Sequence, residues 1–161
     1  MTEVSARRRI WGWWAFDWAS QPYNTLLLTF VFAPYVKDLL GDGSAAQAAW
    51  GYGVGAAGLL IAVLAPVLGA IADRAGGRMR FIWLFSALYL IGAWGLWYAV
   101  PGDFSLAPIM MLFGMGLVGM EFATIFTNAM LPDLGAREEM GRISGTGWAL
   151  GYVGGVLALA I

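Results

Sequence analysis

The chain has 161 residues, of which 60% are hydrophobic and 12% charged. Soluble domains carry about 25% charged residues, so this composition excludes an ordinary soluble domain and predicts an all-α integral membrane protein. The net charge of -1 indicates no class of partner, because the charges are segregated along the chain.

The chain contains neither Cys nor His. It can therefore form no disulfide, and it lacks the most common metal ligands and the usual general base. We expect no cofactor, no metal site and no nucleic-acid partner. A membrane enzyme is the weakest alternative, since Asp17 and Glu121 would be its only acidic groups within the spans.

Five apolar segments are each long enough to cross a bilayer as a helix of about 20 residues. They cover residues 11–36, 48–72, 81–100, 106–131 and 143–161. Polar stretches punctuated by Pro and Gly separate them. We therefore predict a cytoplasmic tail over residues 1–10 and a bundle of five transmembrane helices over residues 11–161.

The basic residues predict the orientation of these spans. Eight of the nine Lys and Arg residues lie before the first span, between the second and third, or between the fourth and fifth; only Lys37 lies on the other side. The positive-inside rule then places the N-terminus in the cytoplasm. A cleaved signal peptide is a weaker alternative, because the first apolar run is long, contains Asp17 and precedes further spans.

The fifth span runs outward and reaches Ile161 without a polar flank. An odd number of spans with an unflanked last one suggests the first part of a longer bundle. We therefore expect further spans of the same protein to be partners of this chain, together with the lipid bilayer.

Two carboxylates lie within the predicted spans. At a rise of about 1.5 Å per residue, Asp17 lies about 9 Å above the cytoplasmic boundary near Trp11, and Glu121 lies about 15 Å above the one near Leu131. A charge at the centre of a membrane helix costs about 2.5–3.5 kcal/mol on insertion scales, so such groups face a cavity or a partner. Glu121, near the midplane, is the stronger candidate for a functional group, and Asp17 fits the cytoplasmic mouth.

Other polar residues recur at helical spacing beside these carboxylates. The two predicted stripes are Asp17, Gln21 and Asn24 in the first span and Glu121, Thr124 and Asn128 in the fourth. Each stripe occupies one helix face, and the two lie at similar depths, so they could line one aqueous path. The alternative is that these side chains only hydrogen-bond neighbouring helices, at about 0.6 kcal/mol each.

Small residues recur at intervals of about four in two spans, which favours close approach of helix backbones. One such track runs along the second span through Gly51, Gly55, Gly58, Ala62, Ala65 and Gly69, and the other consists of Gly147, Gly151 and Gly155 in the fifth. Most tryptophans, Trp11, Trp13 and Trp14 among them, lie near span ends, as interface anchors do.

The loop after the second span reads "GAIADRAGGRMR" (residues 69–80). Asp73 falls at the C-terminal end of a helix, where the dipole disfavours an anion, so it needs a nearby cation. Gly76 permits a tight turn, and arginines can bind carboxylates through two nitrogens. We predict an ionic latch on the cytoplasmic side; the alternative is a solvated basic loop that only sets topology. The latch residues within this loop are Gly69, Asp73, Arg74, Gly76 and Arg78.

This loop, placed between spans 2 and 3, resembles the signature of the major facilitator superfamily, with a departure at Met79 where a second basic residue is common. The stretches "FDWASQPYNTLLLTFVFAPY" (16–35) and "NAMLPDLGAREEMGRISGTGWALGYVGG" (128–155) resemble its vacuole effluxer branch, the bacterial relatives of a yeast vacuolar amino-acid exporter. Members of this branch occur in bacterial cytoplasmic membranes and in vacuolar and other endomembranes.

The resemblance implies twelve spans in two six-helix halves that work by alternating access. This chain would supply five spans of the N-terminal half, with spans 1 and 4 lining the central path. The resemblance also implies that the latch stabilises an outward-open state. Its candidate partners at the next cytoplasmic loop are Asp133, Glu138, Glu139 and Arg142.

Together these features predict a secondary transporter, an exporter of amino acids or similar small metabolites. Glu121 and Asp17 would contact the substrate or carry coupling protons. The alternative is a membrane component without transport activity, either an assembly scaffold or an inactive fragment.

Overall fold

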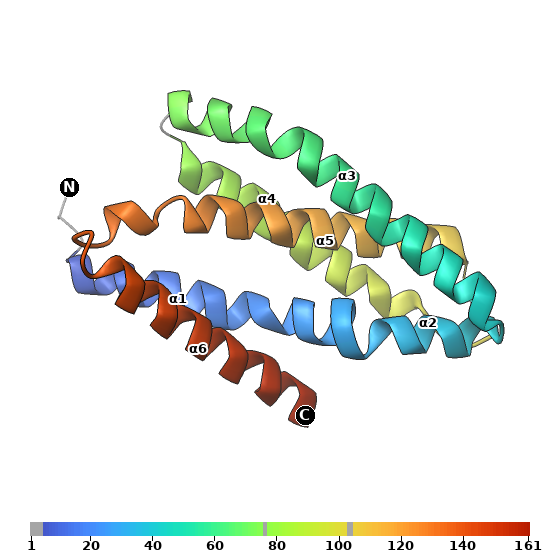
Figure 1. The fold of residues 1–161 in the computed structure, drawn as a ribbon. Helices are drawn as coiled ribbons and strands as arrows, with labels where there is room; N and C mark the ends of the chain where they lie inside the picture. The colour runs from blue at the N-terminus through green and yellow to red at the C-terminus, as the bar shows by residue number, and fades with distance from the viewer. Residues whose placement is uncertain (1–4, 76, 103–104) are drawn as a thin grey trace.

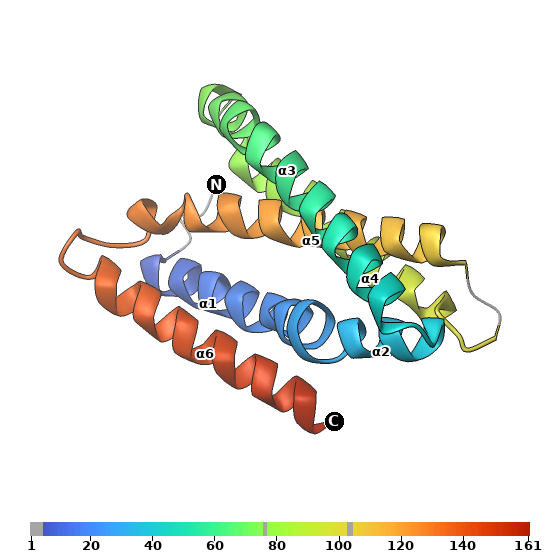
Figure 2. The same cartoon turned by 45° about the vertical axis from the view of Figure 1, so that its right-hand side comes forward.

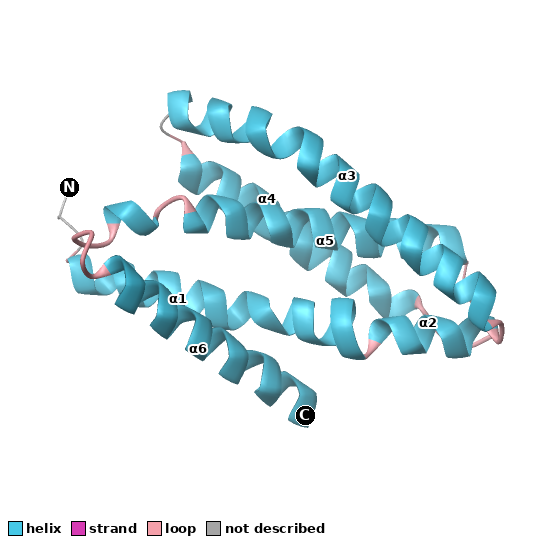
Figure 3. Cartoon of the chain, in the orientation of Figure 1, coloured by secondary structure: helices cyan, strands magenta, loops and turns pink. Residues whose placement is uncertain are grey.

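The computed structural model describes residues 5–75, 77–102 and 105–161, and these form an all-helical bundle (Figures 1 and 3). The elements in chain order are α1 (Ala6–Pro22), η1 (Tyr23–Phe30), α2 (Phe32–Leu40), α3 (Gly43–Ala75), α4 (Arg78–Gly95), η2 (Leu96–Tyr98), α5 (Leu106–Asn128), η3 (Leu131–Asp133) and α6 (Met140–Ala160). The prediction of an all-α chain is confirmed.

Each of the five predicted spans corresponds to one helical rod. Within the described residues, α3, α4, α5 and α6 are the four helices long and apolar enough to cross a membrane. The first rod is composite: α1, η1 and α2 follow one another in line (Figure 1). It differs from the single predicted helix because Pro22 and a π-helical segment interrupt it.

Pro22 changes the hydrogen bonding of the first rod. Proline has no backbone N–H, so the carbonyl of Trp18, four residues earlier, cannot accept the i+4 hydrogen bond of a regular α-helix. The chain then continues as the π-helix η1, in which backbone bonds span five residues, as in the 2.8 Å bond from Val31 N to the carbonyl of Leu26. This wider turn changes which later side chains share a face with those of α1.

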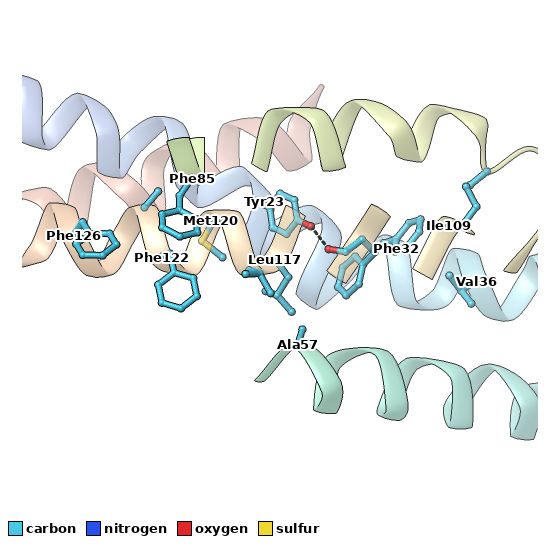
Figure 4. Close-up of a cluster of buried hydrophobic side chains, with 14 of the residues drawn as sticks. Tyr23, Phe32, Val36, Ala57, Phe85, Ile109, Leu117, Met120, Phe122 and Phe126 are labelled. Atoms are coloured by element: carbon cyan, nitrogen blue, oxygen red, sulfur yellow. Dashed lines mark hydrogen bonds between the residues drawn. The ribbon is translucent and has the colours of Figure 1, made fainter. Parts of the chain in front are cut away.

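Helix α5 occupies the middle of the bundle, with α4 along one side and the first rod along another (Figures 1 and 2). The most deeply buried large side chains are Phe113, Met120 and Phe122 of α5 and Val36 of α2. The Tyr23 hydroxyl donates a 2.8 Å hydrogen bond to the carbonyl of Phe113 (Figure 4). This core holds the fourth span against the first.

Glycines allow α4 and α5 to approach closely. A β-carbon built at Gly92 would lie 2.5 Å from the backbone nitrogen of Gly116, and one at Gly119 would lie 2.5 Å from the backbone nitrogen of Tyr89. Side chains cannot be accommodated at such distances. Gly92, Gly116 and Gly119 do not follow a regular four-residue repeat, so the sequence alone does not mark them as contact positions.

The small-residue track of the second span behaves differently from the prediction. A β-carbon at Gly51, Gly55, Gly58 or Gly69 would meet nothing within 4 Å. Helix α3 crosses α5 obliquely (Figure 2). Gly51, Gly55, Gly58 and Ala62 of the track are exposed, whereas Ala65 packs against the core. The predicted close packing is therefore wrong among the described residues, because glycine permits a close contact but does not create one.

Trp13 also departs from its predicted role as an interface anchor. Its side chain is buried, and its indole nitrogen donates a 2.9 Å hydrogen bond to the carbonyl of Thr127 near the end of α5. The indole of neighbouring Trp14 bonds the carbonyl of Ile143 in α6 at 2.9 Å. Both tryptophans join helix ends on the side predicted to be cytoplasmic, and Trp11 is exposed.

Candidate functional site

The polar face of α1 lies against the glycine column of α6. Both helices run in the same direction and lie side by side (Figures 1 and 2). Residues that are four apart on one helix therefore meet residues that are four apart on the other. The contacts pair Trp13 with Gly147, Asp17 with Gly151, and Gln21 with Gly155.

Asp17 approaches α6 closely within this column. A β-carbon at Gly151 would lie 3.3 Å from the Asp17 carboxylate oxygen Oδ2, and the Asp17 side chain is half-buried. About one turn further along α6, a β-carbon at Gly154 would collide with the carbonyl oxygen of Trp18, which loses its i+4 donor at Pro22. The glycines of α6 thus accommodate polar atoms of α1.

The predicted stripe of the first span is divided by the π-helix. Asp17 and Gln21 face α6, and Thr25 continues this face, since its hydroxyl would contact a β-carbon at Gly155. Asn24 instead turns toward α5, where its side-chain nitrogen lies 3.6 Å from the sulfur of Met120. A regular α-helix would have kept Asn24 closer to the face of Gln21.

The stripe of the fourth span meets Asn24 at Met120. The Thr124 hydroxyl lies 3.7 Å from the same sulfur atom, and this contact links the two predicted stripes. Asn128 is exposed at the end of α5. Met120 itself is apolar, so no signal in the sequence could have identified it as the meeting point.

Glu121 is half-buried near the middle of α5. In the part of the chain that the structure describes, no hydrogen bond or ion pair involves its carboxylate. All Lys and Arg residues occur near helix ends or in connecting segments, so no basic residue lies at its depth. Nothing in the described residues neutralises this carboxylate.

A large apolar groove lies between α3 and α5, on the N-terminal side of Glu121 along α5. Its volume is about 790 Å³. Two residues of its lining, Gly114 and Val118, precede Glu121 by seven and three positions on α5. That spacing puts all three on one helix face, so the carboxylate lies one turn from the end of the groove.

A second polar site lies at the cytoplasmic end predicted for the bundle, centred on Arg78. Its Nη2 lies 2.8 Å from Oδ1 of Asp73, and its Nη1 lies 3.3 Å from Oδ2 of Asp133. Nη1 also donates a 3.2 Å hydrogen bond to the carbonyl of Ala129. One guanidinium therefore connects the end of α3, the start of α4 and the segment after α5.

The other residues of the predicted latch lie around this network. Arg142 pairs with Glu139 at 3.0 Å within its own turn, and Arg74 is exposed. A β-carbon at Gly69 on α3 would meet nothing within 4 Å, whereas Gly76 falls outside the described residues. Of the four candidate partners at the next cytoplasmic loop, Asp133 is the one that Arg78 contacts.

The long apolar helices, the carboxylate inside the bundle and the ion-pair network at one end define a multi-pass membrane protein of the transporter class. Comparison with known protein families identifies the family. Residues 1–159 match the model of the Major Facilitator Superfamily, so the chain belongs to this superfamily of membrane transporters and not to an enzyme family.

The chain is also similar to a curated protein, the uncharacterized MFS-type transporter YxiO of Bacillus subtilis (strain 168). The two are 29% identical over 154 residues, which cover 93% of this chain and 36% of that relative. The chain thus spans about a third of the relative's length. No solved structure matches the chain.

Proposed function

We propose that this chain forms part of a secondary active transporter that moves small organic molecules across the membrane by alternating access. The observation that carries the proposal is Glu121, a half-buried carboxylate in the middle of α5 with no basic residue at its depth. Acidic residues inside membrane spans are costly and typically serve substrate or proton pathways. Membership of the transporter superfamily supports the same role.

The polar side chains proposed to line the substrate path belong to the first rod and to α5. Asn24 and Thr124 meet at Met120, and Asn128 lies beyond them at the end of α5. Asp17 and Gln21 lie on the neighbouring face toward α6, where Asp17 would act at the cytoplasmic mouth. Protons are the proposed coupling ion, because a carboxylate can bind and release one without a metal.

The Arg78 network is proposed to act as the gating latch. It connects three helical segments through charge-assisted hydrogen bonds that a rotation of the helices would break. Such contacts stabilise one conformational state over another, as alternating access requires. Arg142, Arg74 and the glycines of this region would tune the same equilibrium.

The finer proposal is efflux of amino acids or similar metabolites across a bacterial cytoplasmic membrane, with the N-terminus inside. It rests on the resemblance of residues 16–35 and 128–155 to the vacuole effluxer branch and on the distribution of basic residues.

The test uses the full-length protein in proteoliposomes with an imposed proton gradient. Gradient-driven movement of an amino-acid mixture should occur with the native protein and with Asp38→Asn, an exposed control at the end of α2. It should be lost with Glu121→Gln. Coupled transport that is unchanged in Glu121→Gln would remove this residue from the mechanism. A native protein that moves no solute would favour the scaffold alternative.

A further inference from the structure

A small pocket lies where α3 ends and α4 begins, at the same end of the bundle as the Arg78 network (Figures 1 and 2). Its volume is about 320 Å³, near the lower end of the range of about 300–1,000 Å³ that is usual for ligand pockets. The residues that line it are Ile71 of α3, Gly77 in the connection, and Arg80, Phe81 and Leu84 of α4. The pocket therefore combines three apolar side chains with one guanidinium.

The α4 side of this pocket changes in polarity along the helix axis. Arg80, Phe81 and Leu84 share one helix face, and Leu84 lies about 6 Å along the axis from Arg80. Arg80 immediately precedes the predicted third span, whereas Phe81 and Leu84 lie within it. The positive group is thus at the predicted cytoplasmic surface of the bilayer, and the apolar lining continues toward the bilayer interior.

The guanidinium of Arg80 is available to a ligand. Arg80 is exposed, and among the residues that the structure describes no ion pair or side-chain hydrogen bond involves it. The two carboxylates at this end, Asp73 and Asp133, both contact Arg78. The charge of Arg80 is therefore not neutralised by the ion pairs of the described chain.

This combination of groups fits the chemistry of an anionic phospholipid. A guanidinium can bind a phosphate through two nitrogens, and basic pockets between membrane helices on the cytoplasmic side bind lipid headgroups. Trp83, one position before Leu84, is also exposed, and tryptophans of this kind are enriched at the level of the headgroups. An acyl chain would cover Phe81 and Leu84, which a free phosphate would leave in contact with water.

We propose that this pocket binds an anionic phospholipid of the cytoplasmic leaflet, with its phosphate at Arg80 and one acyl chain along Ile71, Phe81 and Leu84. Charge complementarity selects this occupant, because the exposed cation has no acidic partner in the described residues and lies at the depth of the phosphates. A zwitterionic phospholipid presents the same phosphate together with its own cation, so it should bind more weakly.

Native mass spectrometry of the delipidated full-length protein in detergent measures the binding. The probes are dioleoyl phosphatidylglycerol and dioleoyl phosphatidylcholine, which share acyl chains and a phosphate but differ in net charge. The protein should bind the first phosphatidylglycerol about fivefold more tightly than phosphatidylcholine. Excess inorganic phosphate should not displace it, because phosphate alone cannot cover the apolar lining.

Arg80→Gln tests the charge of the pocket. It should weaken binding of this phosphatidylglycerol about fivefold and abolish the preference over phosphatidylcholine. Arg137→Gln is the control, since Arg137 is an exposed arginine in another connecting segment outside the pocket. It should bind phosphatidylglycerol as the native protein does.

Leu84→Trp tests the apolar part independently of the charge. The larger side chain should fill the pocket and weaken phosphatidylglycerol binding about fivefold, with Arg80 still present. Leu90→Trp is the matched control, because Leu90 lies on the same helix outside the pocket and is 59% exposed, against 57% for Leu84. It should leave the affinity unchanged.

Equal affinities for the two lipids, displacement by inorganic phosphate, or native affinity in Arg80→Gln or Leu84→Trp would overturn the proposal. An equal loss in Arg137→Gln would also overturn it, since the lipid would then respond to the basic surface as a whole. A native protein that binds neither lipid would show that another segment of the full-length protein covers the pocket, which refutes the site.

Discussion

The guanidinium of Arg78, at the start of α4, lies 3.3 Å from the carboxylate of Asp133, in the short helix that follows α5. The same guanidinium lies 2.8 Å from Asp73 at the end of α3. Asp73 and Asp133 are both largely exposed, so these ion pairs contribute little to stability. We therefore expect these ion pairs to affect the equilibrium between transporter conformations more than the free energy of unfolding.

Arg78→Lys tests this distinction. Lysine offers one ammonium group in place of the three guanidinium nitrogens that Arg78 uses, so it cannot bond Asp73, Ala129 and Asp133 together. The free energy of unfolding should change little, because exposed ion pairs are screened by solvent. The initial transport rate in proteoliposomes should fall about fivefold or more, as expected for a shifted conformational equilibrium. Arg137→Lys, in an exposed loop, should leave both quantities unchanged, and an equal loss in that variant would refute the latch.

Glu121→Gln distinguishes the effect of the membrane-embedded carboxylate on stability from its effect on coupled transport. The substitution keeps the shape of the side chain but removes a charge that is unfavourable in the bilayer, so expression and thermal stability should be retained or improved. Coupled transport should fall at least about tenfold. Counterflow, which needs substrate exchange without net proton movement, should show whether Glu121 carries protons or binds substrate. If counterflow survives while gradient-driven transport is lost, Glu121 carries the proton.

The α6 glycines should differ in how well they tolerate a methyl group. At Gly154 the new carbon would collide with the backbone carbonyl of Trp18, which cannot move without displacing α1. Gly154→Ala should therefore destabilise the protein by about 1–3 kcal/mol. At Gly151 the contact is 3.3 Å from the movable side chain of Asp17, so Gly151→Ala should cost less.

Gly145→Ala is the control for these two variants, because its β-carbon would meet nothing within 4 Å. It should be neutral or stabilising by up to about 1 kcal/mol, since alanine loses less backbone entropy in a helix. Unfolding by SDS titration in mixed micelles measures all three. If Gly154→Ala were as stable as Gly145→Ala, α1 and α6 could not be packed as described.

Tyr23→Phe tests the link between the first rod and α5. The change removes the 2.8 Å hydrogen bond to the carbonyl of Phe113 while keeping the buried ring. Hydrogen bonds between membrane helices contribute about 0.6–1.7 kcal/mol, so the free energy of unfolding should fall by that amount. Tyr152→Phe, at an exposed position on α6, should have no effect in the same SDS titration. Equal stability of both variants would show that the Tyr23 bond contributes nothing.

Much of the architecture follows from the sequence through hydrophobicity and charge. Length and composition predict a helical membrane protein, and alternation of polar loops with apolar runs places the spans within a few residues of α3, α4, α5 and α6. The motif in residues 69–80 predicts ion pairs between its aspartate and nearby arginines, because an aspartate at a helix C-terminus needs a cation. Each of these properties depends on residues close together in the sequence, so it can be predicted without knowing how the helices pack.

The pairing of helices and the exact facing of side chains depend on the tertiary structure. A glycine track is compatible with close packing, but only the fold shows that Gly147, Gly151 and Gly155 have a neighbour while Gly51, Gly55 and Gly58 have none in the described chain. The sequence predicted one stripe for Asp17, Gln21 and Asn24 because it assumed a continuous α-helix. The π-helix after Pro22 directs Asn24 to Met120 on α5 and leaves Asp17 and Gln21 against α6. The length and hydrophobicity of the apolar runs thus determined which segments are predicted to enter the bilayer, whereas packing between distant segments decided which polar groups meet there.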